Sequence, residues 1–273
     1  MDWLDTLIEC KNRIRQNLSP LLGTVDKPQP DLGVGAGGDR IKRVDLAAEA
    51  AVVEVLTGRA ISFTLISEES GVQEYGNRAK ECFVTVDPVD GTTNLMRRLP
   101  FYATSIAVSE RPLLRNVHSG LVADLCHDVT YTAQRGKGSC RDGVRISPSS
   151  KVGFEEAVIG LDVNSYRIDA LVPRLTGLVK KTDHIRHFGA NALELCYVAD
   201  GSTDAFVDIR GKLRTTDVAA ACLILEEAGG VVTTSSGQVL DSVLDPVQKV
   251  EFVAAGNRKL HRMILDLVNL ESG

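Results

Sequence analysis

The sequence predicts a layered α/β fold, in which β-sheets are covered by helices. Three observations predict it: helical periodicity near the N-terminus, a strand-dense stretch after it, and an alternation of strands and helices in the second half. The 273 residues suffice for one large domain or for two intimately packed halves. We expect a strand-rich half at 1–150, with two helices, and an alternating α/β half at 151–273, together forming one compact unit.

The first half begins with two predicted helices. Residues 3–22 carry apolar side chains on one helical stripe, and residues 43–57 form a second helical segment that Gly58 stops. Short runs rich in apolar residues, bounded by turn formers, then predict strands. These strands are 61–66, 82–86, 102–109, 116–124, 128–134 and the region 141–147. We expect them to form an antiparallel sheet that packs against the two helices.

The second half alternates between the two kinds of element, which is typical of a sheet covered by helices. The predicted strands are 157–163, 203–209, 231–234 and 249–255. The predicted helices are 168–181, 190–201, 215–230 and 257–270.

Composition restricts the class of function. The net charge of −5 argues against non-specific binding of nucleic acid, which needs clustered positive charge, and is compatible with binding of cations. None of the six cysteines forms a Cys-x-x-Cys pair, so we expect buried thiols and a reducing, cytoplasmic compartment. No basic segment opens the chain and no apolar run is long enough to span a membrane, so we expect neither a signal peptide nor a membrane partner.

The stretch DPVDGTTN (87–94) directly follows an apolar run. Pro88 cannot donate a ladder hydrogen bond, so we expect the strand to end at Asp87. Asp87 and Asp90 would then point into one space, with the carbonyl of Val89 as a third oxygen, and hard cations such as Mg²⁺ prefer such ligands. Asp, Gly, Thr and Asn are also common turn formers, so the motif alone leaves a cation site and a plain turn equally open.

The residues after the two aspartates suit a phosphate. Gly91 allows the backbone to approach a ligand closely. The N–H groups of Gly91 and Thr92 and the Thr92 hydroxyl can hold phosphate oxygens, the more so if a helix begins there.

Further acids favour the cation reading. Glu68 and Glu69 follow a predicted strand, although two exposed glutamates in a loop are the plain alternative. Asp217 and Asp45 each open a predicted helix, where an acid is also a routine cap or a favourable partner of the helix dipole. Each acid alone is a weak indication, and their joint presence is a stronger one.

Other motifs carry no function. GVGAGG (33–38) matches G-x-G-x-x-G, but KPQPDL before it is not a strand, so we interpret it as a flexible loop rather than a nucleotide site. The five histidines show no metal-ligand spacing, and no G-x-S-x-G elbow supports a serine hydrolase.

The segments VDLAAE, SEES, DPVDGTTN and TDVAAA, in this order, resemble the inositol monophosphatase family. The resemblance extends over nearly the whole chain, and FGANALELCYVADGSTDAFVDIRGKLRTTD is most similar to the archaeal branch, whose members often hydrolyse both inositol 1-phosphate and fructose 1,6-bisphosphate. It implies an α-β-α-β-α sandwich of the sugar phosphatase type, a homodimer, and two or three Mg²⁺ ions per site, with Mn²⁺ as a possible substitute.

The resemblance also implies the residues of the site. The expected metal ligands are Asp45, Glu68, Asp87, the Val89 carbonyl, Asp90 and Asp217. The residues expected to act in catalysis are Asp45, Glu68 and Thr92. The expected substrate contacts are Asp90, Gly91, Thr92, Asp208, Lys212 and Arg214.

The implied function is Mg²⁺-dependent hydrolysis of inositol 1-phosphate, fructose 1,6-bisphosphate or both by a metal-activated water. The loop 33–39 is expected to close over this site as a lid. Two alternatives stay open: a 3′-phosphoadenosine 5′-phosphate phosphatase with the same carboxylates, and a catalytically silent member of the family that acts as a binding protein.

Overall fold

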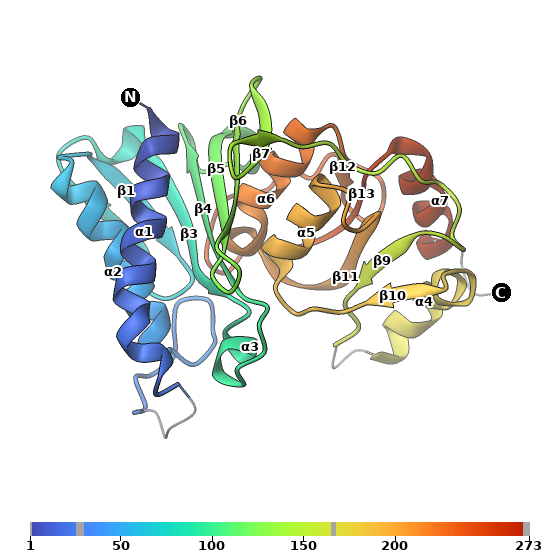
Figure 1. The fold of residues 1–273 in the computed structure, drawn as a ribbon, viewed down its shortest axis with the longest axis horizontal. Coiled ribbons are helices and arrows are strands. Elements are labelled where there is room, and N and C mark those ends of the chain that lie inside the picture. The colour runs from blue at the N-terminus through green and yellow to red at the C-terminus, as the bar shows by residue number, and fades with distance from the viewer. Residues whose placement is uncertain (1, 26–29, 165–167, 270–273) are drawn as a thin grey trace.

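The computed structural model describes residues 2–25, 30–164 and 168–269, and it has five layers (Figure 1). Helices α1 and α2 cover the outer face of a large sheet, α5 and α6 lie between this sheet and a smaller one, and α4 and α7 cover the far face of the smaller sheet. The helices are α1 (Trp3–Leu22), α2 (Arg43–Gly58), α3 (Thr92–Met96), α4 (Ile168–Lys181), α5 (Asn191–Ala199), α6 (Thr215–Ala228) and α7 (Arg258–Asn269). The predicted α-β-α-β-α sandwich is confirmed.

The larger sheet has the strand order β2-β1-β3-β4-β5-β6-β7-β8. Its strands are β1 (Phe63–Ser67), β2 (Gly71–Tyr75), β3 (Phe83–Asp90), β4 (Ala103–Ser109), β5 (Val117–Asp124), β6 (Val129–Gln134), β7 (Gly138–Arg141) and β8 (Val144–Arg145). The expectation of a purely antiparallel sheet is wrong, because β1 and β3 are parallel. After β1 the chain makes a hairpin with β2, which occupies one side of β1, and then crosses to pair β3 on the other side.

The smaller sheet has the order β10-β9-β11-β13-β12. Its strands are β9 (Val158–Leu161), β10 (His184–Arg186), β11 (Ala205–Arg214), β12 (Val231–Thr233) and β13 (Lys249–Ala255). Strand β9 pairs in parallel with β10 and β11, whereas β13 pairs antiparallel with β11 and β12.

Apolar side chains fill the spaces between the layers. Leu7 and Ile14 of α1 are fully buried under the larger sheet, and Leu260 and Ile264 of α7 are fully buried under the smaller one. Helix α6 is apolar on nearly all sides, as expected of a helix with a sheet on each face. The packing of this middle helix fixes its N-terminus relative to the larger sheet.

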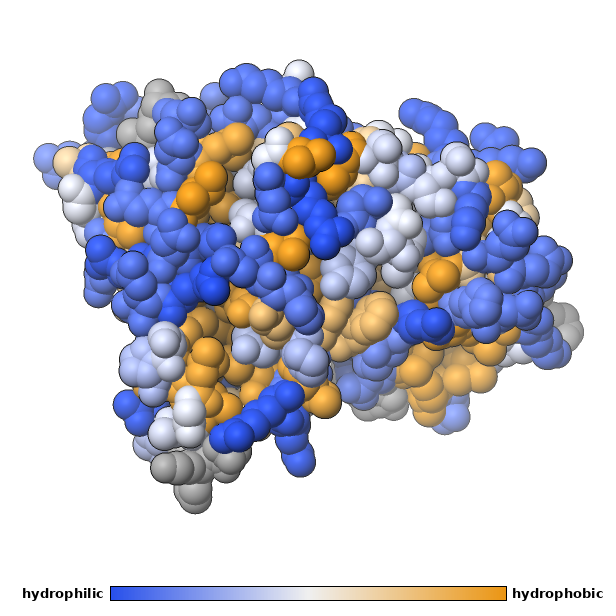
Figure 2. All heavy atoms as spheres, in the orientation of Figure 1, coloured by the Kyte–Doolittle hydropathy of each residue, from blue (hydrophilic) through white to orange (hydrophobic). Residues whose placement is uncertain are grey.

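The visible surface in Figure 2 is largely hydrophilic over the outer helices, and hydrophobic residues show there as separate patches. In residues 2–25, 30–164 and 168–269, no helix combines the length and the apolar character needed to cross a bilayer.

Candidate active site

The motif DPVDGTTN does not end strand β3 at Asp87, as the sequence led us to expect. The strand runs to Asp90, and its pairing with β4 shifts between Asp87 and Asp90. Asp87 and Asp90 are three residues apart on β3, whereas their partners on β4, Ser105 and Ala103, are two apart. Strand β3 therefore has one extra residue, which is a β-bulge. Such a bulge tolerates proline, which is why Pro88 is accepted within the strand.

The bulge also determines where the two aspartates point. Residues three apart on a regular strand lie on opposite faces, because side chains alternate. One inserted residue restores both to the same face, toward the middle layer of helices. Asp87 and Asp90 are only 3% and 4% exposed.

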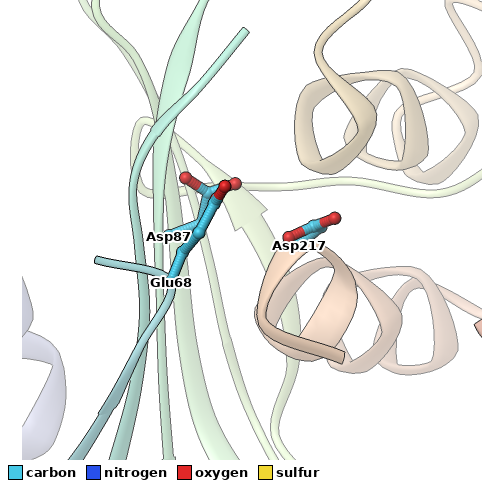
Figure 3. Close-up of side chains that lie close together, drawn as sticks. All are labelled: Glu68, Asp87 and Asp217. Carbon is cyan, nitrogen blue, oxygen red and sulfur yellow. The ribbon is translucent and has the colours of Figure 1, made fainter. Parts of the chain in front are cut away.

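Three carboxylates converge at the junction of the larger sheet and α6 (Figure 3). Glu68 follows β1, Asp87 lies on the adjacent strand β3, and Asp217 lies in the first turn of α6. One carboxylate oxygen from each lies within 4.8 Å of the others. An all-oxygen set of this kind fits a hard divalent cation.

Asp217 is held by the start of its own helix. Its Oδ2 accepts a hydrogen bond of 2.9 Å from the Arg214 N–H, and its Oδ1 accepts one of 3.0 Å from the Thr216 hydroxyl. The sequence left open whether Asp217 caps a helix or joins a cation site. The structure shows that its carboxylate does cap the helix and also lies in the acidic cluster.

Asp90 is held by the N-terminus of another helix. Its two oxygens accept hydrogen bonds from the backbone N–H groups of Asn191, at 3.0 Å, and Ala192, at 2.7 Å, in the first turn of α5. The middle layer therefore orients two of the acids, Asp90 through α5 and Asp217 through α6.

Asp45 and Thr92 lie together beside the bulge. The Thr92 hydroxyl is 2.8 Å from the Val89 carbonyl oxygen and 3.3 Å from Asp45 Oδ1, and Asp45 Oδ2 accepts a hydrogen bond of 3.1 Å from the Lys42 N–H. Asp45 is 3% exposed. This pair can orient a water and take its proton.

Gly91 occupies a position that no other residue suits. Its φ is +84°, in the left-handed region that favours glycine. An added Cβ would lie 3.0 Å from the Ala190 Cβ and 3.1 Å from the Phe101 carbonyl oxygen. Glycine is therefore needed for the turn that connects the bulge to α3.

The acids raise one another's pKa. Burial, followed by repulsion from Asp217, raises the pKa of Glu68 to about 8. Burial and then the charges of Glu68 and Asp90 raise the pKa of Asp87 well above its usual value, and burial raises the pKa of Asp45 to about 7. Divalent cations would offset this concentration of negative charge, so the residues present fit the metal ions that the family uses.

The expected substrate residue Asp208 is fully buried on β11. Its Oδ1 and Oδ2 each accept a hydrogen bond of 3.0 Å from Arg210 Nε, and Arg210 also makes an ion pair of 2.6 Å with Asp162. The sequence reasoning missed Arg210 and Asp162. The two-residue spacing of Asp208 and Arg210 on one strand was a usable signal, because such residues share a face.

Lys212 and Arg214 are placed differently from each other. Lys212 is half-buried, and its Nζ donates a hydrogen bond of 2.8 Å to the Asn164 carbonyl oxygen. Arg214 turns toward the acidic cluster, where its NH1 lies 2.8 Å from Glu68 Oε1. Arg214 therefore contacts an expected metal ligand directly.

Comparison with known proteins agrees with this geometry. The model of the inositol monophosphatase family matches residues 6–271. A fructose-1,6-bisphosphatase/inositol-1-monophosphatase of Methanothermobacter thermautotrophicus is 37% identical, covering 98% of this chain and 97% of that protein. A bifunctional NADP phosphatase/NAD kinase of Methanococcus maripaludis is 33% identical, covering 98% of this chain and 49% of that protein.

The fold has a close counterpart among solved structures. A crystal structure of an inositol monophosphatase-fructose 1,6 bisphosphatase superposes with a TM-score of 0.85 at 28% identity, covering 98% of this chain and 100% of the other. The family match along the chain agrees with the layered fold and with the acids that meet at the N-terminus of α6. This chain belongs to the inositol monophosphatase family.

Proposed function

We propose that this chain, a phosphate monoester hydrolase of its family, acts on inositol 1-phosphate and fructose 1,6-bisphosphate. The observation that carries the proposal is the buried cluster of Glu68, Asp87 and Asp217. The name of the relative from Methanothermobacter thermautotrophicus supports these two substrates.

In this proposal, the acidic cluster holds two or three Mg²⁺ ions, which Mn²⁺ can replace. Bound cations would polarise the phosphate ester and lower the pKa of a water toward neutrality. Besides the cluster, the ligands are Asp45, Asp90 and the Val89 carbonyl oxygen. These six groups come from α2, the β1–β2 turn, β3 and α6, so cation binding joins three layers of the fold.

The chain's own groups have separate tasks. Asp45 Oδ1 and the Thr92 hydroxyl, 3.3 Å apart, orient the attacking water, and Asp45 accepts its proton. Gly91 and Thr92 hold the phosphate with backbone N–H groups, and Gly91 permits the left-handed turn that places these groups.

Arg210 is assigned to the alcohol part of the substrate. Asp162 and Asp208 hold its guanidinium, so Asp208 acts on a substrate through Arg210. We also propose that the protein works as a homodimer in the cytoplasm. The six free thiols support a reducing compartment, and light scattering in solution tests the dimer.

A comparison of substrates tests the proposal. Phosphate release is measured from D-myo-inositol 1-phosphate, fructose 1,6-bisphosphate, NADP and 3′-phosphoadenosine 5′-phosphate, each with and without Mg²⁺, with Asp87→Asn as a control. We expect Mg²⁺-dependent release from the first two and none with Asp87→Asn. Release from NADP alone would favour the activity in the name of the 33% identical relative, and release from none by a folded protein would favour a binding role.

A further inference from the structure

The glycine-rich segment 33–41 forms a small hairpin beside the acidic cluster. Val34 and Arg40 make an isolated β-bridge, and the Gly35 N–H donates to the Asp39 carbonyl oxygen at 2.9 Å. The hairpin is docked by its backbone. Its Ala36 and Gly37 N–H groups donate to the carbonyl oxygens of Glu69, at 3.0 Å, and Glu68, at 2.7 Å.

Arg214 joins this hairpin to the cluster. Its Nε and NH2 donate to the Gly37 carbonyl oxygen at 3.0 and 2.8 Å, and its NH2 also pairs with the Asp39 carboxylate. Its NH1 pairs with Glu68 Oε1 at 2.8 Å. The Arg214 side chain is 11% exposed, and its one guanidinium holds both the tip of the hairpin and an expected cation ligand.

We propose that Arg214 is a positioning residue that couples docking of the hairpin 33–41 to cation binding at Glu68. The inference rests on the proposed function, since it needs a cation at the acidic cluster. By holding one oxygen of Glu68, Arg214 orients this carboxylate so that its other oxygen is available to the cation. Cation binding and hairpin docking then strengthen each other.

The geometry supports a positioning role. Hydrogen-bond partners that orient a metal-ligating side chain are worth about 10- to 100-fold in metal affinity. The planar guanidinium meets three acceptors at once, which a lysine ammonium on a flexible stem does not reproduce. The packing is tight, because a Cβ on Gly37 would lie 2.7 Å from Arg214 Nε and 2.8 Å from Glu68 Cγ.

The positive charge of Arg214 opposes this effect, because it repels a cation. Two carboxylates, of Glu68 and Asp39, already contact this one guanidinium. The group as a whole remains negative, so we expect the gain from orientation to exceed the repulsion. Arg214→Lys keeps the charge, so it isolates the gain from orientation.

If docking of the hairpin raises cation affinity, cation binding must favour docking by the same factor. Substitutions that weaken docking should therefore lower the cation affinity. Asp39 is 72% exposed and contacts the site through Arg214. Asp128 is a control outside the hairpin, since it is 53% exposed and its ion pairs are with Lys11 and Arg15 of α1.

The test is a calorimetric titration of Mn²⁺ into the metal-free protein, with no substrate present, for wild type, Arg214→Lys, Asp39→Asn and Asp128→Asn. We expect the Kd to rise about tenfold in Arg214→Lys and severalfold in Asp39→Asn, and to stay unchanged in Asp128→Asn. Hydrogen exchange at residues 35–38 provides the second measurement. Mn²⁺ should slow exchange there in wild type, and this protection should be smaller in Arg214→Lys and Asp39→Asn.

The outcomes separate the two proposals. A wild type that binds no Mn²⁺ would overturn the proposed function itself. A wild type that binds Mn²⁺ with the same Kd as folded Arg214→Lys and Asp39→Asn would overturn only the coupling. Tighter binding in Arg214→Lys would show that the guanidinium competes with the cation, and would also overturn it.

Discussion

Asp87 is the residue on which the site's electrostatics depend most. It is buried on β3 between Glu68 and Asp90, and the charges of both add to burial in raising its pKa. A carboxylate so placed is unfavourable unless a cation compensates it. The same side chain therefore destabilises the metal-free protein and stabilises the metal-loaded one.

Removing one carboxylate of the cluster should separate activity from folding. We expect Asp87→Asn and Asp217→Asn each to lower kcat by more than about 100-fold. Removing a group that binds the cation directly lowers activity more than removing a residue that only hydrogen-bonds to such a group. The fold should survive, since each change removes a buried charge. Circular dichroism and phosphate release at saturating Mg²⁺ measure both effects, and wild-type turnover in either variant would contradict the ligand assignment.

The Thr92 hydroxyl gives a second prediction for a single residue. Thr92→Ala should lower kcat by about 100-fold at saturating Mg²⁺, because it removes the group that orients the water with Asp45. Thr92→Ser keeps the hydroxyl and serves as the control. A serine variant as slow as the alanine variant would mean that the methyl group, and not the hydroxyl, is what matters.

Sequence and structure agree best on residues of the motifs. The structure brings Glu68, Asp87 and Asp217 together although they lie far apart in the chain, which the sequence could suggest only through their joint presence and the family resemblance. Arg210 escaped prediction because its importance comes from Asp162, a contact that only the parallel pairing of β9 and β11 creates.

At the scale of elements, the long amphipathic segments were predictable and the short ones were not. The sequence predicted α1, α2, α4, α6 and α7 to within a few residues. It missed β2 and β10, which lie at sheet edges and bury few side chains, so they leave no alternating apolar pattern. It also missed α3, whose five residues follow the turn at Gly91.

Helix α6 must approach the larger sheet closely to bring Asp217 to Asp87. Gly120 on β5 permits this approach, because an added Cβ would lie 3.2 Å from both the Cα and the carbonyl oxygen of Ala220. We expect Gly120→Val to cost about 1–3 kcal/mol of unfolding free energy and to weaken Mn²⁺ binding by displacing the helix. Gly23→Ala is the control, since its added methyl meets nothing within 4 Å.

Denaturant titration and calorimetry measure these two effects of Gly120→Val. A loss of stability with unchanged Mn²⁺ affinity would show that the start of α6 stays in place when its middle is pushed outward. The assignment of Gly120 as the contact that sets the position of Asp217 would then be wrong.

At the scale of the whole molecule, the site exists only when the layers are assembled. Asp45 comes from an outer helix, Asp87 from the larger sheet, and Asp217 from the middle layer. In the sequence, each acid is therefore only a separate, weak indication of a site. Folding places the acids together at a free-energy cost that depends on pH and on cations.

Stability of the metal-free protein should therefore fall as pH rises. In the folded protein, the pKa of Glu68 is raised to about 8, and those of Asp90 and Asp45 to about 7. All three are above the unfolded pKa values, which are near 4. Between these limits the native state binds more protons than the unfolded state, so the unfolding free energy decreases with rising pH. In EDTA, we expect the Tm to decrease as the pH rises from about 5 to about 8. The decrease should be less steep in Asp87→Asn, and Mg²⁺ should abolish most of it in wild type. Differential scanning calorimetry across this pH range measures the Tm of both proteins. If Tm changes with pH equally in wild type and Asp87→Asn, the acidic cluster does not control the pH dependence of stability.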